Sequence, residues 1–334
     1  MLVTEVSRFG GPEVLTAREA PDPAAGPGQV MVRTAAADVL LVDTVIRAGR
    51  GVGFFPIRPP YVPGNGVAGQ VTAVGDGADP AWIGRPVVTH TGGAGGAGGY
   101  AEQAVVAATD LIAVPPGLGL PEAAALLHDG ATAFGLLETT AVKPGEWVLV
   151  TAAAGGMGLL LVHLARHAGA RVIGAARGPA KLALVREAGA EAAVDYSEPG
   201  WAEQVRELTV GHGADVVLDG AGGRLGRAAF GVTAPGGRFS AHGMSDGGFA
   251  AFGPEEAASR GITVYPIAGY EPADFRRLAA AALAAAAPGE AAPGEAAAGR
   301  ITPVIGQTFP LRRAADAHRA LETRTALAKT LLLP

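Results

Sequence analysis

The sequence predicts an α/β protein with two parts, one rich in short strands and one built as a doubly wound parallel sheet. Residues 1 to about 120 alternate short apolar runs with Gly and Pro turns, a pattern typical of strands. From about residue 122 strands alternate with helical patterns, which indicates crossover connections. A chain of 334 residues is long enough to bury a core in each part.

In the first part, apolar or alternating runs lie between turn residues. The expected strands are Val30–Thr34, Gly69–Val74, Pro86–His90 and Tyr100–Ala107. The tail from about residue 270 returns to mixed structure, and we expect it to rejoin this part. The predicted domains are therefore residues 1–121 with 268–334, and residues 122–267.

The second part contains six candidate strands separated by helical patterns. The strands are Val148–Thr151, Arg171–Ala175, Ala192–Asp195, Asp215–Asp219, Gly237–Ala241 and Ile262–Pro266. The helices are Leu159–Ala168, Lys181–Ala188, Trp201–Leu208 and Leu225–Gly231. This order predicts a doubly wound parallel sheet.

A glycine-rich turn follows the first of these strands, which begins at Trp147. Gly155 and Gly158 occupy the second and third glycine positions of G-x-G-x-x-G, and Ala153 stands in the first. A helix begins directly after the turn, so unpaired backbone N–H groups are expected at its N-terminus, where a pyrophosphate binds favourably. The turn therefore predicts a bound nicotinamide dinucleotide.

Two other low-complexity segments are expected to be loops. The glycine run Gly92–Gly99 precedes a strand pattern and not a helix, so it does not fit a phosphate-binding turn. The sequence Ala-Pro-Gly-Glu-Ala begins at Ala287 and is repeated at once from Ala292. Pro and Gly in each copy exclude a continuous helix, and a surface loop accepts such an insertion at small entropic cost.

The composition excludes several classes of protein. With 49% hydrophobic and 17% charged residues the chain is a globular protein and not a disordered one. A net charge of −5 without a basic run argues against nucleic acid as a partner. The longest apolar run, Leu278–Ala287, is shorter than the ~20 residues of a membrane span, and the N-terminus does not resemble a secretory signal. We therefore expect a cytoplasmic protein without membrane contact.

Several short motifs occur in a characteristic order along nearly the whole chain. They are Val42–Gly49, Pro63–Gly69, Gly98–Glu102, Ala153–Gly158, Ala214–Asp219, Gly236–Arg238, Ala317–Glu322 and Lys329–Pro334. In this order and spacing the chain resembles the zinc-independent quinone oxidoreductases, or zeta-crystallin-like proteins, of the medium-chain dehydrogenase/reductase superfamily. The resemblance implies a mostly β, GroES-like catalytic domain, a Rossmann NADPH-binding domain, and a homodimer with Ile262–Pro266 near the contact.

The absence of Cys bears on the metal content. Zinc-dependent members of the superfamily use a Cys ligand at the catalytic zinc and four Cys residues at a structural zinc. Neither site can form in this chain. We therefore expect hydride transfer without a bound metal.

The residues after the second strand of the second part favour NADPH over NADH. An NAD site places Asp or Glu about 20 residues beyond the glycine turn, but here the strand ends at Ala175 and Ala176, and Arg177 and Lys181 are the next charged residues. A guanidinium and an ammonium group bind a 2′-phosphate, whereas a carboxylate repels it. The alternative interpretation is an ordinary solvated start of a helix.

The resemblance assigns further residues to the cofactor. It places Lys181 and Tyr196 at the 2′-phosphate and Thr132 near the carboxamide, and it places Arg324 in the cofactor site as well. The full predicted cofactor site is Val42, Thr132, Gly155, Gly156, Met157, Gly158, Arg177, Lys181, Tyr196, Gly220, His242, Gly243, Met244, Tyr265, Pro266, Ile267 and Arg324.

The residues expected near the acceptor depart from the family. Leu40 stands where the family often has Asn, and Val45 stands where one branch has Tyr. Two histidines are candidates to replace these polar groups: His128, expected in the first turn of a helix beside the nicotinamide, and His242, at the carboxyl end of a strand. For each, the alternative is a packed or cofactor-contacting side chain without a proton role.

Two further groups of residues complete the predicted site. Asp43 has a family counterpart, for which a buried hydrogen-bonding role competes with catalysis. Phe54 and Tyr61 lie in a Pro-rich loop that the family folds over the cleft, where they line an acceptor pocket or simply pack.

The sequence predicts an NADPH-dependent, metal-free reductase of quinones or α,β-unsaturated carbonyl compounds. Two alternatives remain open at this point. One is an enoyl-thioester reductase of a biosynthetic pathway, which shares this scaffold. The other is a non-catalytic NADPH-binding protein, because the family's Asn and Tyr are absent.

Overall fold

A computed structural model describes residues 1–50, 56–91, 98–267, 270–288 and 301–334. The chain divides into two compact units. The first consists of Met1–Ala131, Pro272–Gly289 and Pro303–Pro334, and the second is centred on Thr132–Glu271. The first division falls within one helix, α2 (Leu120–Thr140), about ten residues beyond the predicted boundary at 121.

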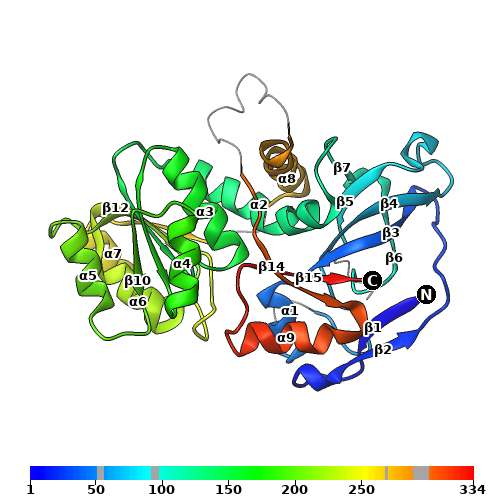
Figure 1. The fold of residues 1–334 in the computed structure, drawn as a ribbon, viewed down its shortest axis with the longest axis horizontal. Coiled ribbons are helices and arrows are strands. Elements are labelled where there is room, and N and C mark those ends of the chain that lie inside the picture. Colours follow the sequence, from blue (N-terminus) through cyan, green and yellow to red (C-terminus); the bar gives the residue numbers. More distant parts are fainter. Residues whose placement is uncertain (51–55, 92–97, 268–269, 289–300) are drawn as a thin grey trace. The chain divides into compact units, whose positions relative to one another are not determined.

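The second unit is a doubly wound parallel sheet of six strands, as the sequence predicts (Figure 1). The strand order is β10 (Ala192–Asp195), β9 (Arg171–Ala176), β8 (Trp147–Thr151), β11 (Ala214–Asp219), β12 (Thr233–Ala241) and β13 (Thr263–Pro266). The helices are α3 (Gly156–His167), α4 (Pro179–Glu187), α5 (Trp201–Leu208), α6 (Gly223–Gly231) and α7 (Pro254–Ser259). The order reverses direction after β8, which creates a switch point at its carboxyl end.

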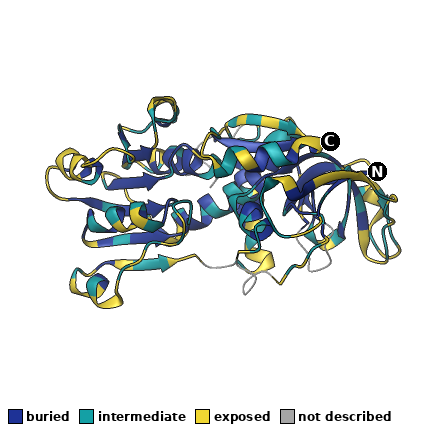
Figure 2. Cartoon of the chain, turned by 90° about the horizontal axis from the view of Figure 1, so that it is seen from below, coloured by how far each residue is buried: buried dark blue, intermediate teal, exposed yellow. Residues whose placement is uncertain are grey.

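The apolar residues of this sheet and of the helices packed on it explain why the sheet is buried. Every residue of β8 is buried, because helices cover both faces of a parallel sheet (Figure 2). On one face Phe230 of α6 stacks on Phe252 with ring centroids 4.1 Å apart. Phe239 of β12 meets both rings edge-on. These three rings anchor α6 to the sheet.

The first unit is built on a largely antiparallel sheet of seven strands. The order is β14 (Ile305–Pro310), β15 (Lys329–Leu333), β3 (Gln29–Asp38), β4 (Gly66–Val74), β5 (Pro86–His90) and β7 (Ile112–Ala113), and β6 (Gln103–Ala107) also pairs with β3. A separate hairpin consists of β1 (Leu2–Val6) and β2 (Leu15–Glu19). The C-terminal strands thus enter the sheet formed by the N-terminal residues.

Four predicted strands differ from the structure by three or four residues at one end. Two of them begin earlier than predicted, β4 at Gly66 and β12 at Thr233. The strand predicted at Tyr100–Ala107 begins only at Gln103, because Tyr100 to Glu102 bond instead to β1 and to the segment at Pro63. The strand predicted at Val30–Thr34 extends to Asp38, because Ala36, Ala37 and Asp38 are buried and continue the apolar run.

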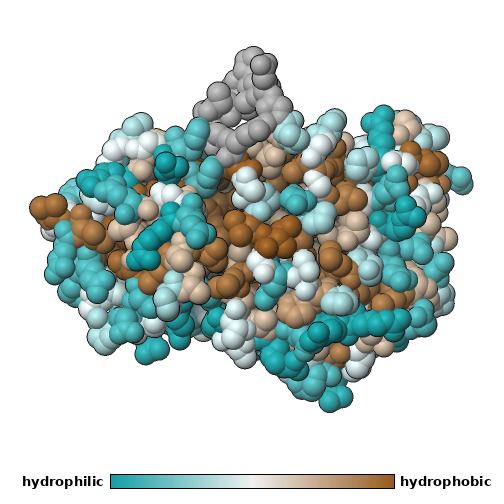
Figure 3. Space-filling view, in the orientation of Figure 1, coloured by the Kyte–Doolittle hydropathy of each residue, from teal (hydrophilic) through white to brown (hydrophobic). Residues whose placement is uncertain are grey.

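Four helices belong wholly or partly to the first unit: α1 (Leu41–Arg47), α2, α8 (Pro272–Ala286) and α9 (Ala314–Glu322). In α9, Ala314, Ala317 and His318 are buried, while Asp316 forms ion pairs with Arg313 and Arg319 at the surface. Figure 3 shows hydrophilic residues over this helix. The 3.6-residue period of the apolar positions explains which face is buried.

Three predicted features lie outside the described residues in whole or in part. They are most of the glycine run Gly92–Gly99, the substrate candidate Phe54, and the tandem repeat beyond Pro288. Among the described residues, no helix has the length and apolarity needed to cross a membrane.

Candidate functional site

The glycine turn of the second unit leads directly into α3. Ala152 adopts a left-handed conformation with φ of 52°, and Gly155 is the N-cap of α3 without a side-chain hydrogen bond. The helix begins at Gly156, three residues earlier than predicted, and its first turn contains no acidic residue. The backbone N–H groups of this turn have no acceptor within the helix. Unpaired N–H groups at a helix N-terminus favour an anion, here at the carboxyl end of β8.

The geometry explains why glycine occupies two of these positions. A Cβ atom at Gly158 would lie 2.5 Å from the carbonyl oxygen of Ala152, so only glycine lets the helix start this close to the strand. At Gly155 the nearest atom would be 3.4 Å away, so the approach to the helix N-terminus remains open. Ala153, in the first glycine position, is fully buried under the turn. These residues fit a pyrophosphate group.

The residues predicted to bind a 2′-phosphate come together at the carboxyl ends of β9 and β10. Asp195, the last residue of β10, pairs with Ala176, the last of β9. The N–H of Tyr196 donates to the carbonyl of Ala176 at 3.1 Å, which places Tyr196 beside the segment that carries Arg177. Arg177 is exposed, and Lys181 is partly exposed in the first turn of α4.

Sequence reasoning missed Asp195 at this edge. Its carboxylate accepts hydrogen bonds from the N–H of Gly178 at 2.7 Å and of Ser197 at 2.9 Å. Partial burial raises the pKa of Asp195, but hydrogen bonds from Ser197 and Gly178 and the charge of Arg177 outweigh it and hold this pKa below its ordinary value. The carboxylate therefore remains charged and shapes the loop before α4. The sequence signal that could have found Asp195 is a predicted strand that ends in Asp and lies next to the strand that ends in Ala176.

The remaining cofactor candidates of this unit follow β11, β12 and β13. A Cβ atom at Gly243 would lie 2.0 Å from the carbonyl oxygen of Gly220, so the loops after β11 and β12 are in close contact. Asp219 supports this arrangement, because its carboxylate accepts from Thr151 Oγ1 at 2.6 Å and from the N–H groups of Ala221 and Gly222. Met244 follows in the same loop, Tyr265 and Pro266 end β13, and the exposed Ile267 comes directly after this strand.

His242 is buried at the end of β12. Its Nδ1 lies 3.2 Å from Ser240 Oγ. Burial lowers the pKa of His242 to about 4, so its imidazole is neutral at neutral pH. A neutral ring can orient a neighbouring group through a hydrogen bond, but it is not a reservoir for an acidic proton.

In the first unit, His128 meets a buried carboxylate. Its Nδ1 lies 2.8 Å from Oδ2 of Asp38, which ends β3 and is completely buried. Its Nε2 lies 3.1 Å from Nδ1 of His90, at the end of β5. The expectation that His128 lies in the first turn of its helix is wrong, because α2 already begins at Leu120. Both ring nitrogens of His128 therefore have partners within the protein.

Asp43 is the centre of a second buried network in this unit. It accepts from the N–H of Leu40 at 2.8 Å and from Asn65 Nδ2 at 2.7 Å. Tyr100 lies 3.4 Å away through its hydroxyl and also contacts His318 Nε2 at 2.9 Å. Burial raises the pKa of Asp43 to about 7. These contacts fix the start of α1, and the side chain is only 2% exposed, which supports a structural role.

The other candidates, in the first unit and on α2, divide by burial. Leu40, Val42 and Val45 lie partly exposed at and within α1. Tyr61 is 5% exposed and belongs to the core cluster of the unit, which favours the packing interpretation for this residue. Arg324 is exposed after α9 with a left-handed φ of 61°. Thr132 is partly buried on the part of α2 that belongs to the second unit.

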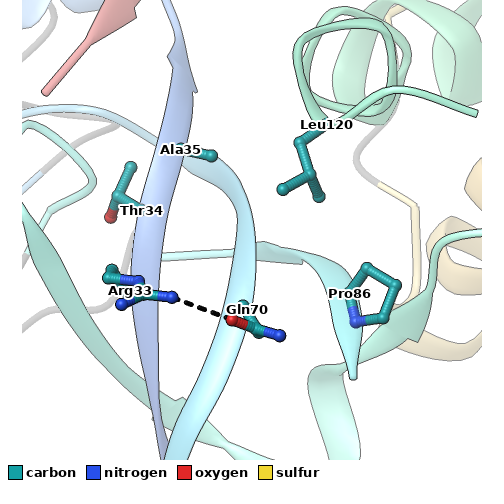
Figure 4. Close-up of a pocket in the computed structure, with 6 residues that line it drawn as sticks. All are labelled: Arg33, Thr34, Ala35, Gln70, Pro86 and Leu120. Carbon is teal, nitrogen blue, oxygen red and sulfur yellow. Dashed lines mark hydrogen bonds between the residues drawn. The ribbon is translucent and has the colours of Figure 1, made fainter. Parts of the chain in front are cut away.

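A hollow of about 370 Å³ in the first unit contains none of these candidates (Figure 4). Its lining residues are Arg33, Thr34, Ala35, Gln70, Pro86 and Leu120. Arg33 donates to Gln70 Oε1 across it at 2.9 Å. We assign no substrate to this hollow.

No three His, Asp or Glu side chains of the described residues gather to hold a metal ion. The chain contains one H-x-x-x-H spacing, a pattern that can bind zinc, because His163 and His167 lie four residues apart in α3. This spacing places the two rings on one helix face. Within the described part of the chain they have no third ligand.

Comparisons with known proteins give a consistent assignment. Residues 26–116 match the alcohol dehydrogenase GroES-like domain, and residues 156–285 match the zinc-binding dehydrogenase family. A 2-haloacrylate reductase from a Burkholderia species is 33% identical over 341 residues, covering 100% of this chain and 99% of the relative. A quinone oxidoreductase from Pseudomonas aeruginosa is 32% identical, covering 99% and 98%.

Solved structures and one partial match extend the comparison. The Escherichia coli quinone oxidoreductase in complex with NADPH has a TM-score of 0.87 and 27% identity, with both chains fully covered. A mycobacterial protein in complex with NADPH has a TM-score of 0.86 and 33% identity, again over both full chains. Part of the phthioceranic/hydroxyphthioceranic acid synthase of Mycobacterium tuberculosis is 36% identical over 222 residues, which is 66% of this chain and 10% of the synthase.

Proposed function

The chain belongs to the quinone oxidoreductase family of the medium-chain dehydrogenase/reductase superfamily, and from that premise we propose that it is an NADPH-dependent, metal-free reductase of quinones or α,β-unsaturated carbonyl compounds. The observation that carries the proposal is the glycine turn before α3, together with the cations at the end of β9. When bound, NADPH would supply a hydride.

The residues of the second unit support NADPH in two ways. The N–H groups at the start of α3 hold the pyrophosphate, with Gly155 leaving the approach open. Arg177, Lys181 and Tyr196 hold the 2′-phosphate. Asp195 does not oppose this role, because its carboxylate is occupied by N–H donors of its own loop. Two relatives of known structure are described as complexes with NADPH.

The names of the relatives support electron-poor, conjugated acceptors. One relative is a 2-haloacrylate reductase and another a quinone oxidoreductase. Both substrates contain a C=C bond conjugated with a C=O bond, so hydride can add at carbon while charge moves to oxygen. Leu40 and Val45 give the acceptor site apolar surface, which favours substrates with hydrocarbon substituents at ~25 cal/mol per Å² buried.

The partial match to the phthioceranic acid synthase favours a second candidate, an enoyl-thioester reductase. An enoyl thioester also has a C=C bond conjugated with a carbonyl, so the same hydride chemistry applies. The two candidates differ in the size and charge of the group attached to the carbonyl.

A panel of acceptors tests the proposed function. We expect the purified protein to oxidise NADPH at least tenfold more efficiently than NADH with one or more of a benzoquinone, an alkylated naphthoquinone, an alkyl enone and 2-chloroacrylate. Faster turnover of crotonyl-CoA than of all of these would favour the enoyl-thioester reductase. NADPH binding without turnover of any acceptor would indicate a non-catalytic NADPH-binding protein.

Activity is expected to survive removal of metal ions. The chain has no Cys, and among its described residues His163 and His167 lack a third ligand. Dialysis against EDTA should therefore leave kcat unchanged with the best acceptor of the panel. Loss of turnover that added zinc restores would contradict metal-free catalysis.

We propose a homodimer that forms through β13. This strand ends the parallel sheet and, among the described residues, pairs with β12 alone, and Ile267 beyond it is 53% exposed. An edge strand of this kind invites pairing, and a two-fold axis allows two copies to cover each other. Light scattering should give twice the chain mass of 33.2 kDa, and Val264→Lys should reduce it to one chain mass. A wild-type monomer at micromolar concentration would refute the dimer.

A further inference from the structure

Two buried side chains of the second unit join the carboxyl ends of neighbouring strands. Thr151 is the last residue of β8 and Asp219 is the last residue of β11, and the two are partners in the register of the parallel pair. The hydroxyl group of Thr151 donates to Oδ1 of Asp219 at 2.6 Å. The strand order reverses between β8 and β11, so this contact lies where open α/β sheets bind their ligands.

The same contact organises the loop that follows β11. The N–H of Ala221 donates to Thr151 Oγ1 at 3.0 Å and to Asp219 Oδ1 at 3.1 Å. The N–H of Gly222 also donates to Asp219 Oδ1, at 3.1 Å. A Cβ atom at Gly226 of α6 would lie 2.3 Å from Asp219 Oδ2, so glycine leaves the space that the carboxylate occupies. Burial raises the pKa of Asp219 above its ordinary value, because it outweighs the hydrogen bonds that the carboxylate accepts from Thr151 and from this loop.

The loop after β11 is bonded in turn to the loop after β12. The N–H groups of His242 and Gly243 donate to the carbonyl oxygen of Asp219 at 3.2 and 2.9 Å. The N–H of Asp246 donates to the carbonyl oxygen of Ala221 at 2.7 Å. The backbone and the side chain of Asp219 therefore connect both loops to the end of β8.

The glycine turn begins directly after Thr151 and is held on two sides. The N–H of Ala153 donates to the carbonyl oxygen of Ala175 in β9 at 3.0 Å, and Thr151 is bonded to Asp219 on the side of β11. Between these two contacts Ala152 has a left-handed φ of 52°, which is sterically unfavourable for a residue with a Cβ atom. Contacts on both sides hold this conformation, and with it the direction of the N–H groups at the start of α3.

We propose that Thr151 and Asp219 are positioning residues for the cofactor. Their hydrogen bond couples the loops after β11 and β12 to the glycine turn, so that all three loops are in place before the dinucleotide binds. Loops that become ordered only on binding cost conformational entropy and lower the affinity, and this contact removes that cost. The inference rests on the proposed function, in which these loops bind NADPH. Neither residue is among the predicted site residues.

Two substitutions at Thr151 separate a positioning role from a packing role. Valine has nearly the shape of threonine but lacks the hydroxyl group, whereas serine keeps the hydroxyl group and lacks the methyl group. If Thr151 only packed within β8, valine would be harmless and serine would be harmful. The positioning role predicts the opposite order, because only serine can still donate to Asp219.

Equilibrium binding of each cofactor to the free protein tests the proposal. Thr151→Val should raise the Kd for NADPH roughly tenfold, within the range of one lost hydrogen bond, and should raise the Kd for NADH by the same factor. The two factors are equal because both cofactors contain the pyrophosphate, whereas loss of a group that binds the 2′-phosphate would weaken NADPH alone. Thr151→Ser should bind both cofactors nearly as the wild type does.

A matched control is Thr233→Val. Thr233 is as deeply buried as Thr151, and its hydroxyl group donates to the carbonyl oxygen of Ala229 at 3.2 Å, but it lies at the amino end of β12. Its replacement removes a buried hydroxyl group at the opposite end of the sheet, so both Kd values should stay unchanged. A Kd that is unchanged in Thr151→Val, or weaker binding by Thr151→Ser than by Thr151→Val, would overturn the positioning role.

A second measurement does not depend on the cofactor. In the free protein, amide hydrogen exchange should become faster in Thr151→Val at Ala221, at Gly222 and at Gly243, whose own acceptor is untouched, and it should not do so in Thr233→Val. Unchanged exchange at Gly243 would overturn the coupling between the loops. A wild-type protein that binds neither cofactor would instead overturn the proposed function, and the exchange rates alone would then decide whether Thr151 couples these loops.

Discussion

Replacement of Lys181 by alanine is expected to weaken NADPH binding roughly tenfold to a hundredfold and to leave NADH binding nearly unchanged. Only NADPH has a 2′-phosphate, and a hydrogen bond to a charged group contributes about 1.5–3 kcal/mol. Arg177 and Tyr196 lie at the same sheet edge, so part of the phosphate site remains in the variant. Fluorescence titration of each cofactor into the free protein measures both dissociation constants.

A matched control for this prediction is Lys143→Ala. Lys143 is an exposed lysine of the same unit. It lies in the turn before β8, at the amino ends of β8 and β9, whereas Arg177 and Tyr196 follow the carboxyl ends of β9 and β10. Its removal changes the net charge by the same amount, so any general effect of charge appears in both variants. Equal weakening of NADPH and NADH by Lys181→Ala would show that this lysine does not bind the 2′-phosphate.

The cofactor half of the site follows from the sequence because its signals are local. The strand, turn and helix from Trp147 to His167 are contiguous, and Gly158 has a steric reason within the same segment. The alternation of strands and helices then places Arg177 and Tyr196 at one edge without further information. The starts of α3, α4 and α6 lie two or three residues before the predicted ones, because the turn residues themselves enter the first turn.

The contacts of His128 in the first unit are harder to predict, because they join residues that are distant in sequence. His128 and Asp38 are 90 residues apart, and Lys329 belongs to the last strand of the chain. No hydrophobic periodicity in the sequence links positions that are this far apart along the chain. One local signal was available: Pro121 and Glu122 mark a helix start at Leu120, which would have placed His128 well inside α2.

A polar residue at the end of an otherwise apolar strand is the other useful signal. Asp38 ends the buried run of β3 in this way, as Asp195 and Asp219 end β10 and β11. In all three cases the carboxylate meets hydrogen-bond donors or cations at the strand end. Strand-terminal acids therefore identify where the sheets of both units present polar groups, although not which partners they find.

Replacement of Lys329 by methionine is expected to reduce the free energy of unfolding by about 3–5 kcal/mol at neutral pH, the usual cost of removing one partner from a buried ion pair. Lys329 is 4% exposed and lies between Asp38 and Asp129. Methionine fills most of the volume of the lysine stem, so the loss reports on charge and not on a cavity. Urea unfolding measures it, and Lys143→Met should stay within about 0.5 kcal/mol of the wild type because its side chain is exposed.

The pH dependence of this loss distinguishes a charge effect from a packing effect. In the wild type the pKa of Asp38 lies below its ordinary value, so Asp38 contributes stability above the unfolded pKa of about 3.9 that is lost as pH falls through its folded pKa. Without Lys329 one cause that lowers the pKa of Asp38 is lost while burial still raises it, so this pKa rises and the variant loses part of the stability that charged Asp38 contributes. The difference in unfolding free energy between wild type and Lys329→Met should therefore be smallest near pH 4 and largest at pH 7 to 8. This pH range lies below the range in which Lys329, whose own pKa is raised, loses its proton. A loss of the same size at every pH in this range would mean that Lys329 stabilises the unit by packing and that Asp38 does not depend on its charge.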